Sequence, residues 1–230
     1  MSIKILARNV IKDFNLEYPL NLYKFCNDLN INIYREDIDM DGCLICNKGK
    51  TAIIVNSNNL NREKFSIAHE LGHFFIPSHN ELMFKCYDVG NSAVITKVEN
   101  EREADEFASE ILLPEALITK YTDDLTISKI IEAANVFETS LLSTAIRLIK
   151  LTEENAILIY LSKDKIKWHI WSDVGFMQLN TNFEFKGFVS KDKIRSTQII
   201  TNDEDIEYIS SEVYKINNND KLILIKEFCE

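Results

Sequence analysis

The chain has 230 residues, enough for one large domain or two small ones, and its 46% hydrophobic and 27% charged residues are a globular composition. The net charge of −10 argues against direct nucleic-acid binding, because phosphate contacts need a cationic surface. No apolar run is long enough to span a membrane, no secretion signal opens the chain, and the five cysteines are scattered. We therefore expect a cytoplasmic protein with free thiols and no membrane partner.

The first half of the chain alternates helical and strand-like patterns. Helical spacing predicts a helix over residues 19–30, and β-like runs follow at 31–36, 42–46 and 51–56. The "NKGK" between the last two runs is typical of a tight turn and predicts a hairpin. The next stretch, "REKFSIAHELGHFFIP" (62–77), predicts a helix that Asn59 or Asn61 caps and Pro77 ends.

After residue 77 the patterns are mostly helical up to residue 150, and they change to strand-like runs after residue 155. A mixed loop is expected over 78–97, a helix over 98–113, a short helix over 115–120, and a helix–turn–helix-like pair over 127–136 and 140–150. That pair carries few basic residues, which favours packing over DNA reading. After residue 155, β-branched and aromatic runs predict strands. The predicted domains are 1–152, which includes the helical pair (127–150), and a β-rich 153–230.

Two of the four histidines, His69 and His73, lie four residues apart in the 62–77 helix. Residues at this spacing share one helix face, so both imidazoles can bind one zinc ion. Glu70 points about 100° around the helix from His69, where it can act as a general base on water. The alternative is a helix that carries two histidines by chance, so a third ligand is needed.

The 98–113 helix supplies candidates for that ligand in "ENEREADEFASE". Glu101 and Asp105 share a face of this helix, and the small residues Ala104 and Ala108 allow it to approach the 62–77 helix closely. If Glu101 binds the metal, Asp105 can accept a hydrogen bond from a ligand histidine and fix its ring. Glu103 points nearly opposite Glu101. The alternative is that this acidic face is only solvated.

Together the two stretches, "NREKFSIAHELGHFFIPSH" and "EREADEFASEILLP", resemble the ImmA/IrrE family of zinc metallopeptidases. The resemblance covers about residues 20–150 and includes the hairpin and the helical pair. It implies that His69, His73 and Glu101 bind Zn²⁺ and that Glu70 is the catalytic base. With the predicted elements, it implies an α+β chain: a zincin-like peptidase domain with a small antiparallel sheet, active-site helices and a helical bundle, and then a small β-rich C-terminal domain.

The same resemblance implies a zinc metallo-endopeptidase that cleaves a helix-turn-helix repressor and so derepresses mobile-element, phage or stress genes. Two alternatives stay open: a non-catalytic metallopeptidase-like regulator that binds a repressor or DNA, and a toxin–antitoxin component. Candidates for a second oxyanion donor are His79 and Tyr121. An extended substrate can pair with a free sheet edge, either the 51–56 strand or its hairpin partner.

Overall fold

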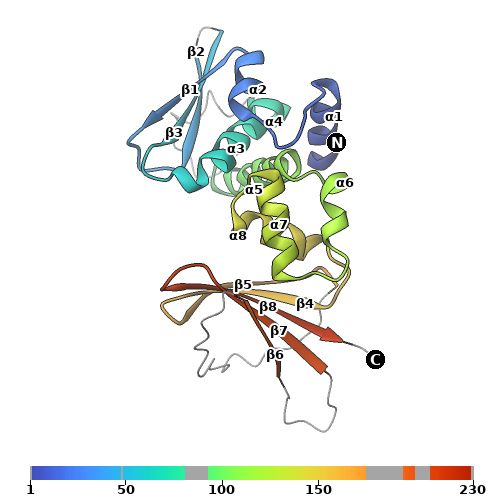
Figure 1. Ribbon diagram of the computed structural model, residues 1–230. Coiled ribbons are helices and arrows are strands. Elements are labelled where there is room, and N and C mark those ends of the chain that lie inside the picture. Colours follow the sequence, from blue (N-terminus) through green and yellow to red (C-terminus); the bar gives the residue numbers. More distant parts are fainter. Residues whose placement is uncertain (1, 48, 81–92, 175–193, 200–207, 229–230) are drawn as a thin grey trace. The chain divides into compact units, whose positions relative to one another are not determined.

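In the computed structural model, the described residues are 2–47, 49–80, 93–174, 194–199 and 208–228 (Figure 1). They divide into two units, Met1–Pro114 with Val136–Ser140, and Glu115–Asn135 with Leu141–Glu230. The predicted boundary near residue 152 assigned the helical pair to the first domain. The structure groups most of that pair with the C-terminal sheet instead.

The first unit contains three strands and most of the long helices. Its elements are α1 (Ile3–Asp13), α2 (Leu22–Asp28), β1 (Ile31–Glu36), β2 (Gly42–Asn47), β3 (Lys50–Asn56), the short 3-10 helix η1 (Leu60–Arg62), α3 (Glu63–Phe75), α4 (Pro77–Asn80) and α5 (Ala93–Leu112). Helix α1 was not predicted. The described part of the predicted 78–97 loop is helical: Pro77–Asn80 form α4, and α5 begins at Ala93 rather than at residue 98.

The sheet of the first unit has the strand order β1-β3-β2, so β2 is an edge strand and β3 is central. The predicted hairpin is confirmed, because β2 and β3 pair antiparallel from Gly42 opposite Val55 to Asn47 opposite Lys50. Gly49 takes the positive φ of +77° that this tight turn favours. The sheet is mixed rather than antiparallel throughout, because β1 runs parallel to β3.

Helix α3 packs through a fully buried face that includes Ile67, Ala68 and Leu71. The short helix η1 precedes it. Asn59 lies at the N-cap position of η1 and Arg62 at that of α3, and neither side chain makes a capping hydrogen bond, so the predicted cap by Asn59 is wrong. The helix ends at Phe75 as predicted, because the residue before Pro77 is held extended.

The second unit holds an antiparallel five-stranded sheet in the order β5-β4-β8-β7-β6. Its elements are α6 (Glu115–Ile118), η2 (Thr119–Tyr121), α7 (Ile127–Phe137, whose last residues belong to the first unit), α8 (Leu141–Leu151), β4 (Ala156–Ser162), β5 (Lys165–Trp171), β6 (Ile194–Ile199), β7 (Tyr208–Lys215) and β8 (Asp220–Phe228). The predicted β-rich C-terminal region is thus confirmed for its described strands. One of the predicted strand-like runs after residue 155, "FEFKGFV" (183–189), lies outside the described residues.

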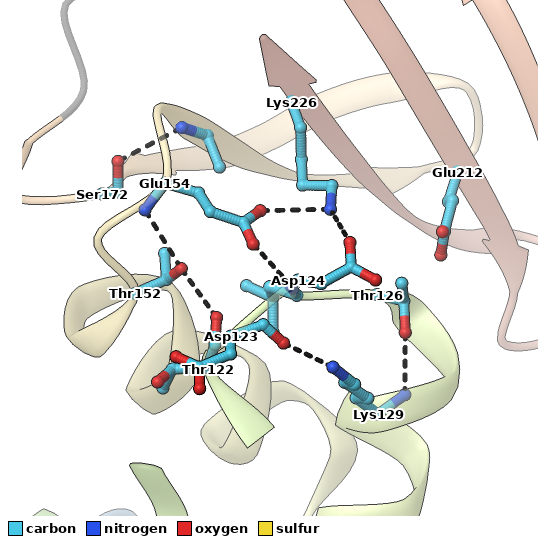
Figure 2. A network of polar contacts seen from close by, with 12 residues as sticks. Thr122, Asp123, Asp124, Thr126, Lys129, Thr152, Glu154, Ser172, Glu212 and Lys226 are labelled. Atoms are coloured by element: carbon cyan, nitrogen blue, oxygen red, sulfur yellow. Dashed lines mark hydrogen bonds and ion pairs between the residues drawn. The ribbon is translucent and has the colours of Figure 1, made fainter. Parts of the chain in front are cut away.

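A polar network joins the start of α7 to this sheet (Figure 2). The Lys226 ammonium on β8 lies 2.9 Å from Asp124 and 3.1 Å from Glu154, and only 6% of its side chain is exposed. The backbone N–H of Ile127 donates to the Glu212 carboxylate on β7 at 2.7 Å. A carboxylate at a helix N-terminus satisfies an otherwise unpaired donor and complements the helix dipole. The helical pair is therefore anchored to the sheet within this unit.

Among the described residues, no helix combines the length and the apolar character that crossing a membrane requires.

Candidate metal centre

The site is built where α3 crosses α5. A Cβ atom added to Gly72 would lie 3.0 Å from Cα and 3.1 Å from the carbonyl oxygen of Ala104. Carbon atoms pack best at about 3.5–4.0 Å, so the two backbones approach closely only because position 72 has no side chain. The close approach predicted for Ala104 is present. It brings the histidines of α3 against the carboxylates of α5.

Gly72→Ala should therefore destabilise the protein by about 1–3 kcal/mol, because the methyl group must push the helices apart. Helix propensity alone has the opposite sign, since alanine is favoured over glycine by about 1 kcal/mol inside a helix. Urea unfolding of the metal-free chain measures the difference. A Gly72→Ala chain more stable than the wild type would contradict this account of the crossing.

Three donor atoms converge beside this crossing. The Nε2 atoms of His69 and His73 lie 3.1 Å apart, and Glu101 Oε2 lies 3.0 Å from Nε2 of His69. All three ligand atoms lie within 4.8 Å of one another. A tetrahedral zinc ion with ligands at about 2.0–2.1 Å keeps its donor atoms about 3.3 Å apart. Two imidazoles and one carboxylate at this spacing fit a zinc ion and leave a position for water.

Each of the two α3 histidines also has a partner on its other ring nitrogen. Nδ1 of His69 lies 2.9 Å from Asp105 Oδ1, which is the contact that the sequence predicted for Asp105. Nδ1 of His73 lies 2.9 Å from Nδ1 of His79, and Nε2 of His79 lies 3.0 Å from Glu103 Oε2. His79 is buried and both of its nitrogens have partners. This geometry supports a contact to His73, not the predicted oxyanion donation.

Glu70 lies on α3, between the two histidines, and its side chain turns toward the edge strand β2. It is only 6% exposed, and a Cβ atom added to Gly42 would lie 3.2 Å from its Oε1, so glycine leaves room for this carboxylate. Burial raises the pKa of Glu70 to about 7, against the lowering effects of His69 and of the hydrogen bond from the Leu44 backbone. A carboxylate of this kind can both accept and release a proton near neutral pH.

The pKa values of His69 and His73 are shifted in opposite directions. Burial alone would lower the pKa of His69. The hydrogen bond to Asp105 and the nearby carboxylates raise this pKa by more than burial lowers it, so the net shift is upward. Burial and the adjacent His69 lower the pKa of His73 to about 4. A neutral imidazole is the form that binds a metal ion.

The last predicted site residue, Tyr121, is buried in η2 of the second unit, and its role as an oxyanion donor stays a prediction. Sequence reasoning missed three contributors to the centre: Gly72, Gly42 and Glu103. A glycine inside the histidine motif, three residues before the last residue of α3, was the available signal for the first. Nothing in the local sequence pointed to the other two, because their partners lie on different elements.

Comparison with known proteins places the chain in a family. Residues 26–148 match the model of a peptidase family described as "IrrE N-terminal-like domain". Metallopeptidase ImmA of Bacillus subtilis (strain 168) is 32% identical over 120 residues, which are 51% of this chain and 67% of that protein. A solved Mycobacterium tuberculosis transcriptional regulator has a TM-score of 0.59 and 10% identity, over 98% of this chain and 88% of its own; this is a likeness of fold alone. The chain therefore belongs to the ImmA/IrrE family of metallopeptidases.

Proposed function

We propose that the protein is a zinc-dependent endopeptidase that cleaves a helix-turn-helix transcriptional repressor. The observation that carries the catalytic part is the convergence of His69, His73 and Glu101, with the buried carboxylate of Glu70 on the same helix. Membership of a metallopeptidase family implies a metal ion. Two nitrogens and one carboxylate oxygen are a ligand set typical of catalytic zinc.

In this proposal each residue of the centre has one task. A bound zinc ion would supply a Lewis acid that polarises water and the scissile carbonyl. Glu70 accepts the proton of the attacking water and then delivers it to the leaving amine nitrogen. Asp105 holds the ring of His69 by the 2.9 Å contact to Nδ1, which leaves Nε2 directed at the converging donor atoms.

The substrate peptide is proposed to add to the edge strand β2. Since β3 is central in the sheet, β2 is the member of the predicted hairpin that has an edge. The backbone of Leu44 on β2 donates to Glu70, so this edge runs beside the proposed base. An extended peptide paired there would form main-chain hydrogen bonds that hold its scissile bond near Glu70.

The repressor as substrate rests on the family resemblance, and it would place the reaction in the cytoplasm. The net charge of −10 suits a partner with a basic, DNA-binding surface, because opposite charges steer association.

The test is to incubate the purified, zinc-loaded protein with the helix-turn-helix repressor encoded beside its gene. We expect cleavage at one or a few peptide bonds, detected by mass spectrometry of the products, and loss of cleavage after chelation of zinc. Zinc binding with stable association but no cleavage would contradict the proposal and favour the non-catalytic regulator. If the protein neither binds zinc nor cleaves the repressor, the metal centre itself is rejected.

A further inference from the structure

His79 is the third histidine of the centre, and it lies outside the ligand set. It belongs to the short helix α4, directly after α3, and its side chain is 2% exposed. Its backbone N–H donates to the carbonyl of Ile76 at 3.0 Å, which fixes the turn between the two helices. A buried imidazole needs partners for its polar atoms, and here both partners are titratable side chains, His73 and Glu103.

His73, His79 and Glu103 form a row of hydrogen bonds that all run in one direction if His73 binds a metal. The Nε2 atom of His73 must then offer a lone pair to the metal, so the proton of His73 is on Nδ1. That proton is donated to Nδ1 of His79 over 2.9 Å. His79 in turn carries its proton on Nε2 and donates it to the Glu103 carboxylate over 3.0 Å. Glu103, as an acceptor, ends the chain.

We propose that His79 and Glu103 are positioning residues that hold the ring and tautomer of His73 for metal binding. The inference rests on the proposed function, because it requires His73 to be a ligand. His69 obtains the same support directly, from Asp105 at 2.9 Å. Both ligand imidazoles of α3 are thus oriented by carboxylates of α5, one directly and one through a second imidazole.

The contacts from His73 through His79 to Glu103 connect His73 to a carboxylate that does not face the metal centre directly. Glu103 is two residues from Glu101, about 200° around α5, so the two side chains cannot both face the ion. His79 lies on the side of the centre that Glu103 faces, and it spans the distance between that carboxylate and His73. A carboxylate that hydrogen-bonds to a ligand imidazole through its second nitrogen makes the imidazole a stronger ligand.

The test measures the zinc affinity of the full chain by competition with a chromophoric chelator. We expect His79→Leu, which removes the acceptor, to weaken zinc binding by about tenfold to a hundredfold, the usual effect of losing such a partner. Glu103→Gln keeps a neutral acceptor and should weaken binding less. His79→Asn keeps an acceptor atom at the δ position and should restore part of the affinity. His169→Leu and Glu106→Gln are the matched controls and should bind zinc as the wild type does.

Three outcomes overturn the inference. If the wild type binds no zinc, the proposed function fails and the inference fails with it. If the wild type binds zinc and His79→Leu binds it equally tightly, the inference alone fails. If His79→Leu does not fold, judged by circular dichroism of the metal-free chain, Glu103→Gln decides, since Glu103 is one-third exposed and its substitution should leave the fold intact. Unchanged affinity in Glu103→Gln then overturns the inference.

Discussion

Replacing Glu70 by glutamine should leave zinc binding near the wild-type level and reduce peptide cleavage by about a hundredfold to ten-thousandfold, the usual contribution of a general base. Glutamine has nearly the same shape and fits the space that Gly42 leaves beside Oε1. It cannot accept the proton of the attacking water. The measurement is kcat/KM on a peptide that spans the cut site, with the zinc content of each preparation determined in parallel.

The matched control is Glu106→Gln, which makes the same chemical change on α5, outside the contacts of the centre. It should cleave at the wild-type rate. Full activity of Glu70→Gln with bound zinc would exclude Glu70 as the base. Loss of zinc in Glu70→Gln would instead mean that the carboxylate supports the metal, and the division of roles along α3 would have to be revised.

Periodicity along each helix was enough to predict which of these side chains share a face. His69 and His73 share a face because of their spacing, and Glu101 and Asp105 share another for the same reason. The structure brings these four side chains together at 2.9–3.1 Å in the contacts His69–Asp105, His69–Glu101 and His69–His73. The hairpin was also predictable, because "NKGK" is a local turn signal.

Contacts between elements could not be predicted in the same way. The role of Glu103 depends on where the four-residue helix α4 turns His79, and the parallel pairing of β1 with β3 depends on the path of the chain between them. The grouping of the helical pair with the C-terminal sheet depends on partners such as Lys226 and Asp124, which are 102 residues apart. No window of local sequence contains such information.

The two helices contribute different kinds of side chain to the centre. Helix α3 supplies the nitrogens and the proposed base from one buried turn, whereas α5 supplies the carboxylates. The contact of Gly72 with Ala104 fixes the distance between the two sets. A change in either helix that alters this distance should affect metal binding even when every ligand is retained.

Replacing Glu101 by alanine should weaken zinc binding by more than the tenfold to hundredfold typical of an outer partner, because it removes a proposed ligand outright. Cleavage at a fixed, limiting zinc concentration should fall with zinc occupancy. The fold should survive, since the Glu101 side chain is 49% exposed and its ion-pair contacts among the described side chains, at 3.0 Å to His69 and 3.7 Å to His73, lie within the centre. Chelator competition and the urea midpoint of the metal-free chain separate the two effects.

Glu106→Ala is the control for this experiment, because it removes a carboxylate from the same helix without touching the converging donor atoms. A Glu101→Ala chain that binds zinc as tightly as Glu106→Ala would show that the third ligand is another group, and Asp105 would be the first to examine, one helical turn away. Weak zinc binding in Glu101→Ala together with an unchanged urea midpoint would assign Glu101 to the metal rather than to the fold. If the carboxylate served packing, its loss would lower both the zinc affinity and the urea midpoint.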